Sequence, residues 1–339
     1  MWTREVNMNQ ERTTLNRRDF IKGSVAGLAG LSAVNLSSRA GYDSSQTAKI
    51  ALVKTSDRTV GVNECLKLFS YPPVQGKNIY IKPNFNTADP TPGSTHNDTL
   101  KQLVQTVHNQ GAAKISVGDR SGPTPTAEVL ATKKLPDMAQ ELDFKLMNFS
   151  ELGTQDWILQ HPKGSHWQDG FLFARPALET EYFISTCCLK THQYGGVFTM
   201  SLKLSVGLVP RKQMRELHNS PDMRKMIAEI NLAYKPQLIV MDGIETFVDG
   251  GPMEGTRKNA DVFLAGDDRV AMDAVGVAVL KELGANESIM GRKIFAQEQI
   301  QRAAELELGI QSPEQIEFVT SDRPSQNYAE KLKAILAKG

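Results

Sequence analysis

Reactive side chains gather between positions 190 and 218 of the sequence. His192 and His218 contribute imidazoles there, and Lys190 and Lys203 contribute amines. Imidazoles and amines are suited to metal ligation, proton transfer and covalent attachment. We therefore expect His192, Lys203 and His218 to be catalytic, and the two histidines to be metal ligands. For His192 taken alone, a loop histidine with an ordinary hydrogen bond explains the residue equally well.

Two adjacent glycines, Gly195 and Gly196, closely follow His192. Because glycine has no Cβ atom, its backbone can approach a ligand closely. We expect Gly195, Gly196 and the nearby Lys190 to bind a ligand.

Polar residues also stand at the ends of other apolar, strand-like runs. Lys82 and Asn84 close one run, Asp119 and Arg120 follow a second, and Asp242 follows a third. In open α/β sheets, ligands bind beyond the carboxyl ends of the strands, and several cations at one edge would attract a carboxylate or a phosphate. We expect Asp119 to be catalytic and the other four residues to bind a small anionic ligand. Turns also favour Asp, Asn and Gly, which explains part of this pattern without any function.

The hydrophobic pattern predicts the elements that would position these residues. Short apolar runs rich in β-branched residues predict buried strands at 49–54, 78–82, 114–118, 182–188, 237–241, 262–265 and 315–320. Helical patterns, several of them closed by glycine, lie between these runs at 99–109, 127–142, 220–234, 270–283 and 292–308. This alternation is typical of an α/β fold with a mostly parallel sheet and helices on both faces.

One segment, 149–175, interrupts the alternation with aromatic residues, glycines and prolines. We expect it to be a β-hairpin insertion or a lid. If the chain has two lobes, their boundary is expected at 149–180.

Composition argues against several classes of function. The 339 residues carry 39 basic and 38 acidic side chains, a net charge of +1, without the clusters of Lys, Arg and aromatic residues that bind nucleic acid. Beyond residue 40, no apolar run reaches the roughly 20 residues of a membrane helix. Three cysteines are too few for a disulfide framework or a protein-held iron–sulfur cluster. The adjacent Cys187 and Cys188 form either a vicinal disulfide or two small core residues.

The N-terminal residues resemble a twin-arginine export signal. Arg17 and Arg18 precede an aromatic residue, a lysine and an apolar stretch over 23–36, and Ala40 closes a cleavage site. The alternative is an N-terminal amphipathic helix, for which the many glycines are unfavourable.

This resemblance implies a signal peptide at 1–40, a linker at 41–47 and one domain at 48–339. It also implies export in the folded state to the periplasm or another extracytoplasmic place, with the twin-arginine translocation machinery as a partner. Proteins with such signals are often loaded with a cofactor before export.

A set of short motifs in the mature chain is similar to the DUF362 family, which is named for its lack of a known function. The motifs are Lys82-Pro83-Asn84, Gly118-Asp119-Arg120-Ser121-Gly122, Leu189-Lys190-Thr191-His192, Lys203 with Gly207, Asp242-Gly243, Gly250-Gly251-Pro252 with Gly255, and Ala271-Met272-Asp273-Ala274. Some relatives carry a ferredoxin-like part, but its cysteines are missing here, so no iron–sulfur cluster is expected. Leu204 stands where the family commonly has an asparagine, and Cys187 and Cys188 where a proline is common.

The same region is also similar to lactate racemase-type enzymes. In that family a lysine carries a covalent nickel-pincer nucleotide, and histidines bind the metal and transfer protons. Here Lys203 would be the attachment point, with His192 and His218 on either side of it. The glycines do not directly precede the lysine as they do in that family. The resemblance implies a transition metal or a covalently held cofactor, and a hydroxy acid as substrate.

Three functions are compatible with this sequence. The first is an exported enzyme with an anion- or metal-cofactor-binding site at the strand ends, which requires Asp119, Arg120, Lys190, His192, Lys203 and His218 to line one cleft. The second is a non-enzymatic binding or accessory protein for a metal, cofactor or small anion. The third is a racemase-like nickel-pincer enzyme.

Overall fold

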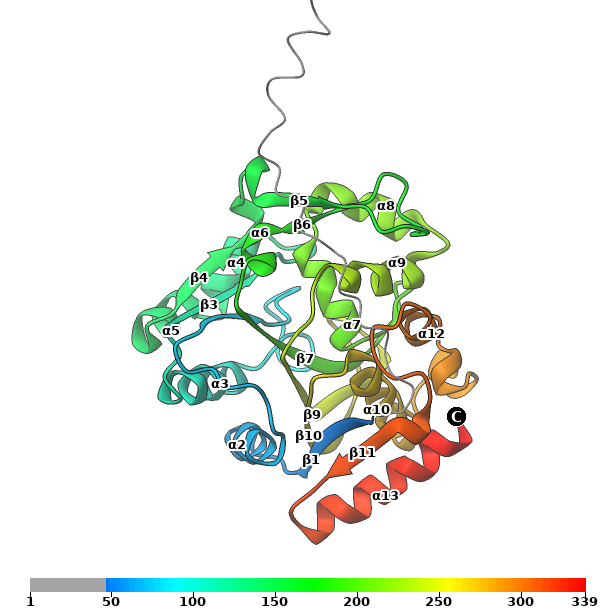
Figure 1. The fold of residues 1–339 in the computed structure, drawn as a ribbon. Coiled ribbons are helices and arrows are strands. Elements are labelled where there is room, and N and C mark those ends of the chain that lie inside the picture. The colour runs from blue at the N-terminus through cyan, green and yellow to red at the C-terminus, as the bar shows by residue number, and fades with distance from the viewer. Residues whose placement is uncertain (1–46) are drawn as a thin grey trace, which may run out of the picture. The chain divides into compact units, whose positions relative to one another are not determined.

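The computed structural model describes residues 47–339. The expected signal peptide at 1–40 and the expected linker, apart from its last residue, lie outside the described residues. The described chain contains a nine-stranded sheet with the strand order β11-β1-β10-β9-β7-β2-β3-β4, in which the short strand β8 pairs with β7 (Figure 1). A separate two-stranded sheet is formed by β5 and β6.

The large sheet is mostly parallel. Pairs β1–β11, β2–β3, β2–β7, β3–β4 and β7–β9 are parallel, whereas β10 is antiparallel to both of its neighbours. The predicted α/β class is therefore confirmed. The strands are β1 (Ala48–Lys54), β2 (Asn78–Lys82), β3 (Lys114–Asp119), β4 (Lys145–Asn148), β5 (Trp157–Gln160), β6 (Phe171–Ala174), β7 (Tyr182–His192), β8 (Val197–Thr199), β9 (Leu238–Gly250), β10 (Gly255–Gly266) and β11 (Ile316–Val319).

Helices cover both faces of the sheet. Side chains alternate along a strand, so Ile50 and Leu52 pack in one core cluster with α10, α12 and α13, while Ala51 and Val53 pack in another with α2, α3, α4 and α5. The α-helices are α2 (Arg58–Leu68), α3 (Asn97–Asn109), α4 (Thr126–Thr132), α5 (Leu135–Leu142), α6 (Arg175–Leu178), α7 (Ser201–Leu204), α8 (Met214–Asn219), α9 (Met223–Ile230), α10 (Arg269–Glu282), α11 (Glu287–Met290), α12 (Glu298–Glu305) and α13 (Arg323–Lys338).

Short 3₁₀ turns complete several connections. They are η1 (Phe149–Glu151), η2 (Thr154–Asp156), η3 (Ser205–Leu208), η4 (Arg211–Gln213), η5 (Asn231–Ala233), η6 (Ile294–Ala296) and η7 (Pro313–Gln315). The single helix predicted at 127–142 is wrong, because Lys134 adopts a left-handed backbone (φ 54°) that separates α4 from α5.

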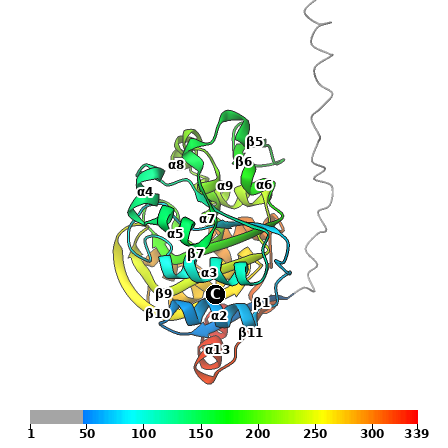
Figure 2. The same cartoon turned by 90° about the vertical axis from the view of Figure 1, so that its left-hand side faces the viewer.

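The interrupting segment forms an antiparallel hairpin, in which Trp157 faces Ala174 and Gln160 faces Phe171. Strands β5 and β6 lie beside α8 and α9, at the end of the described unit opposite α13 (Figure 2). A third core cluster, which includes Phe149, Phe171 and Phe173, packs there. The predicted lobe boundary at 149–180 stays a prediction.

Cys187 and Cys188 are buried free thiols. They are neighbours on β7, and successive strand side chains point to opposite faces of the sheet. Cys187 and Cys188 are therefore two core residues and do not form a vicinal disulfide. Within residues 47–339, no helix is both long enough and apolar enough to span a membrane.

Candidate functional site

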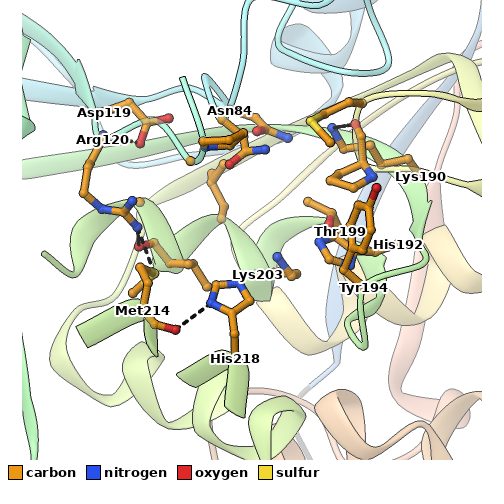
Figure 3. A pocket seen from close by; sticks show the side chains of 18 of the residues that line it. Asn84, Asp119, Arg120, Lys190, His192, Tyr194, Thr199, Lys203, Met214 and His218 are labelled. Atoms are coloured by element: carbon orange, nitrogen blue, oxygen red, sulfur yellow. Dashed lines mark hydrogen bonds between the residues drawn. The ribbon is translucent and has the colours of Figure 1, made fainter. Parts of the chain in front are cut away.

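A cavity of about 410 Å³ opens at the carboxyl ends of β2 and β3 and beside β7. Figure 3 shows most of the side chains that line it. Eight of the residues singled out in the sequence line this one cavity, namely Lys82, Asn84, Asp119, Arg120, Lys190, His192, Lys203 and His218. They come from segments up to 136 positions apart in the chain, so the predicted convergence in one cleft is confirmed as geometry.

The length of β7 creates this arrangement. Its pairing with β2 ends where Lys82 faces Ser185, but β7 continues to His192. Beyond β2, strand β8 takes the free edge and places Thr199 opposite Lys190. The alternation of side chains along β7 puts Lys190 and His192 on the same face, and both line the cavity together with Thr199. The prediction that β7 ends at residue 188 is wrong, because these polar residues are buried strand residues.

One corner of the cavity is closed by an ion pair. Lys82 Nζ lies 2.8 Å from Asp119 Oδ1 and donates a hydrogen bond to the carbonyl of Pro83 (2.7 Å). Asp119 also accepts hydrogen bonds from the backbone N–H groups of Phe85 and Arg120, both at 2.7 Å. Both carboxylate oxygens are therefore engaged, so Asp119 orders this corner, and a catalytic role for it stays a prediction.

Arg120 is engaged in the same way. Its guanidinium donates to the carbonyls of Val209 (2.6 Å), Ser121 (2.9 Å) and Val206 (2.8 Å) and lies 3.1 Å from the Met214 sulfur. These bonds fasten the segment 206–214 to the end of β3. We call Lys82, Asp119 and Arg120 the paired corner.

Gly207 makes the paired corner possible. A Cβ atom at this position would lie 2.1 Å from Asp119 Oδ1 and 2.8 Å from Lys82 Nζ. Only a residue without a side chain lets η3 approach the ion pair this closely.

Lys190 is fully buried and has backbone partners only. Its Nζ atom donates to the carbonyls of Gly93 (2.5 Å) and Pro252 (2.9 Å). Burial lowers the pKa of Lys190 to about 8. Since no carboxylate balances it among the residues lining the cavity, Lys190 contributes positive charge to the cavity.

His192 is held in its neutral form. Burial, reinforced by Lys203 and Lys190, lowers the pKa of His192 to about 2. Its Nδ1 atom is buried and unpaired. The ring of Tyr194 stands edge-on to it at 6.0 Å.

Lys203 lies on α7, and within residues 47–339 its ammonium group has no hydrogen-bond or ion-pair partner. Burial and the charges of Lys190 and Arg120 lower the pKa of Lys203 to about 7. The start of α7 is fixed by Asp273 of α10, which accepts hydrogen bonds from the backbone N–H groups of Ser201 (2.8 Å) and Leu202 (3.2 Å). Asp273 is therefore a positioning residue for Lys203.

His218 lies at the exposed side of the cavity, on α8. Its Nδ1 atom is 2.7 Å from the carbonyl of Met214, as Figure 3 marks. A carbonyl only accepts hydrogen bonds, so Nδ1 carries the proton, and in the neutral ring Nε2 is an acceptor. We call His192, Thr199 and Lys203 the unpaired wall, with His218 beside it.

Three predicted ligand-binding residues do not line this cavity. Asp242 is buried, but its carboxylate accepts from Arg58 Nε (2.8 Å) and from the Thr99 hydroxyl (2.9 Å). Gly195 forms the turn between β7 and β8 with a φ of 80°. A Cβ atom on Gly196 would lie 2.8 Å from Lys203 Cε and 2.9 Å from His192 Nδ1, so Gly196 packs behind the unpaired wall.

Sequence reasoning missed other residues that line the cavity, including Asn86, Thr199 and Arg211. Thr199 Oγ1 and Asn84 Nδ2 are buried without partners. Asn86 follows the Lys82-Pro83-Asn84 motif, which is a signal that could have found it. Thr199 and Arg211 are common residue types outside any motif.

The side chains present do not fit a metal ion held by the protein alone. Residues 47–339 contain no group of three or more His, Cys, Asp or Glu side chains that could hold one. His192 and His218 share the cavity with five Lys and Arg side chains, which disfavour a cation. The prediction that these two histidines bind a metal therefore has no support in the geometry.

A family model for a domain of unknown function, DUF362, matches residues 79–278. The chain belongs to the DUF362 family. The matched residues contain the cavity and both of its sides, so the site of this DUF362 protein lies within the family domain.

Two comparisons give more distant similarities. A thylakoid-associated protein of Synechocystis is 24% identical over 216 residues, which cover 61% of this chain and 64% of that protein. The chain thus spans less than two thirds of that relative. The lactate racemase apoprotein from Thermoanaerobacterium thermosaccharolyticum superposes with a TM-score of 0.43 at 11% identity, over 85% of this chain and 86% of that structure.

Proposed function

We propose that this DUF362 protein is an enzyme that binds a small organic anion in the cavity and acts on it with the amine of Lys203. The observation that carries the proposal is the lone amine of Lys203, which faces a cavity and has a pKa lowered to about 7. A lysine whose amine is neutral near pH 7 is suited to act as a base or a nucleophile, because either role needs a free lone pair.

The charge of the cavity supports an anionic ligand. Besides Lys203, its lining contains four cationic side chains, Lys82, Arg120, Lys190 and Arg211, against the single carboxylate of Asp119. Because Asp119 is already paired with Lys82, the remaining positive charge is available to a ligand.

Unpaired polar atoms support a ligand in the same place. Asn84 Nδ2 and Thr199 Oγ1 can donate hydrogen bonds to an acidic group, and both lack partners in the described residues. Buried polar groups without partners are costly, so a ligand that accepts from them would be stabilised. His218 Nε2 offers an acceptor for a hydroxyl group or a proton of that ligand.

The reactivity of Lys203 tests the proposal. The full chain is labelled with acetic anhydride at a series of pH values, with and without butyrate, and labelling at each lysine is measured by peptide mass spectrometry. Lys203 should react with a midpoint near pH 7, and butyrate should slow its reaction. The exposed Lys163, which lines neither this cavity nor its neighbour, is the internal control. A midpoint for Lys203 near the ordinary lysine value, about 10.4, would overturn the proposal.

Turnover separates an enzyme from a binding protein. Loss of a measured turnover in Lys203→Met, with butyrate binding weakened but still measurable, supports the enzyme. Retained binding with no turnover of any organic acid by the wild-type chain would instead support an anion-binding or accessory protein.

A second candidate is a covalently attached anionic cofactor on Lys203, as the likeness to lactate racemase-type enzymes implies. The unpaired Lys203 amine and the basic lining fit such a group, which would supply the redox or hydride chemistry that side chains lack. Lys203 would hold it, while Lys190 and Arg211 would balance its charge. Intact mass of the natively produced protein is the test, since an adduct lost in Lys203→Arg supports this candidate and a bare polypeptide mass argues against it.

We also propose that the protein is exported in its folded state. The support is the pair Arg17 and Arg18 ahead of an apolar stretch. Replacing both arginines by lysine should leave the precursor inside the cell, as followed by fractionation and immunoblotting. Unchanged export of that variant would contradict this localisation.

A further inference from the structure

A second cavity, of about 530 Å³, adjoins the first one. Arg120 and Arg211 line both cavities, so the two spaces meet at these side chains. Each volume falls within the roughly 300–1,000 Å³ of known small-molecule pockets. Displacement of the Arg211 side chain would join them into one elongated site.

The second cavity has a different chemistry from the first. Much of its wall is apolar, with Phe149, Leu152, Trp157, Leu172 and Pro210. Trp157 and Leu172 come from the two strands of the β5–β6 hairpin. The charged residues of its lining are all cations, Arg120, Arg211 and Lys212.

The junction combines a fixed and an adaptable cation. Arg120 is fastened to the carbonyls of Val206 and Val209. The Arg211 guanidinium makes only long contacts, at 3.5 Å to the Ser121 carbonyl and 3.4 Å to the Thr124 carbonyl. Arg211 can therefore turn toward a ligand that passes from one cavity to the other, and its planar guanidinium suits both a carboxylate and an aromatic face.

We propose that the second cavity binds the aromatic or other apolar end of the same organic anion whose acidic group lies in the first cavity. The inference rests on the proposed function and deepens it, because it assigns the substrate class as an organic acid with an extended apolar tail. Trp157 and Leu172 are its specificity-determining residues.

A matched pair of acids tests this assignment. Butyrate and 4-phenylbutyrate share one acidic group and differ by a phenyl ring, and their binding to the full chain is measured by isothermal titration calorimetry. Burying a phenyl ring against these walls should tighten binding by about 10-fold to 100-fold. The gain should vanish in Trp157→Ala and in Thr154→Trp, which fills the cavity from its exposed rim, while butyrate affinity stays unchanged.

The hairpin supplies its own control. Leu159 is on β5, is 59% exposed and does not line the second cavity, so Leu159→Ala should keep the full gain. Equal binding of the two acids by the wild-type chain, or an undiminished gain in Thr154→Trp, would overturn the inference and leave the proposed function standing. Failure of both acids to bind would instead overturn the proposed anion site itself.

Discussion

The paired corner and the unpaired wall lie on the same cavity but treat buried charge in opposite ways. In the corner, Lys82 and Asp119 neutralise each other, and hydrogen bonds use up the remaining polar atoms. On the wall, Lys203 has no such partner, and the buried His192 Nδ1 and Thr199 Oγ1 atoms are unpaired. Desolvation is compensated in the corner and uncompensated on the wall. The paired corner therefore stabilises the structure around the cavity, whereas the unpaired wall has polar groups free to bind a ligand.

The largest effect is expected from removing the carboxylate of the corner. Asp119→Ala leaves the charge of Lys82 buried without its partner, which costs about 3–5 kcal/mol of unfolding free energy. Urea denaturation followed by circular dichroism measures the loss. Adding Lys82→Met to the variant should restore a large part of it. A loss of unfolding free energy below about 1 kcal/mol would show that the paired corner does not stabilise the fold more than the unpaired wall does.

Two glycines give a matched comparison of the two sides. Gly207→Ala pushes a methyl group against an ion pair that cannot move, and should cost about 1–3 kcal/mol. Gly196→Ala meets the flexible Lys203 stem and the His192 ring, neither of which is held by a side-chain hydrogen bond within residues 47–339, so a smaller loss of stability is expected, together with slower acetylation of Lys203. Equal destabilisation by the two variants in thermal unfolding would contradict a rigid corner beside an adaptable wall.

Removing the unpaired amine should not lower stability. Lys203→Met replaces an uncompensated charge by a side chain of similar length, so the unfolding free energy should stay unchanged or rise by up to about 4 kcal/mol. Butyrate binding should weaken at the same time, as calorimetry would show. If this variant loses stability as Asp119→Ala does, Lys203 has a structural partner and the wall is not unpaired.

The pH dependence of stability compares two buried groups of the wall, Lys203 and His192. The folded-state pKa of Lys203, about 7, lies below its ordinary 10.5, so the unfolded chain binds more protons between these values and stability rises with pH there. Lys203→Met should flatten this rise in the thermal midpoint. The pKa of His192 is lowered from 6.5 to about 2, so its contribution to stability is lost as pH falls below 6.5. His192→Gln should flatten that acid limb, and an unchanged slope would contradict a buried neutral imidazole.

The sequence predicted the fold class and most strands because buried parallel strands are short, apolar and rich in β-branched residues. It failed at β7, because the apolar run stops at Cys188 while the strand continues through Lys190 and His192. Polar residues in a strand are normally a sign of its end. Here Lys190 and His192 stay within the strand because their side chains face a cavity. That cavity is formed by segments that are distant in the sequence, so the strand pattern alone does not reveal it.

The sequence predicted those site residues whose type is uncommon at the end of a strand. Lysine and histidine near strand ends are uncommon in turns, so Lys82, Lys190 and His192 stood out. The position of Asp242 outside the cavity could not be foreseen, because its partner, Arg58, is 184 positions away. Thr199 was missed because only its pairing opposite Lys190 brings it to the cavity.

The two walls of the cavity differ in their backbone. Strand β7 is buried along its whole length and hydrogen-bonded on both edges, whereas the facing segment 205–219 consists of two 3₁₀ turns, η3 and η4, and the six-residue helix α8. Short elements of this kind open locally at lower free energy than core strands. Amide hydrogens at 205–219 should therefore exchange with solvent before those at 182–192, so that the facing segment and not the strand is the side of the cavity expected to open first.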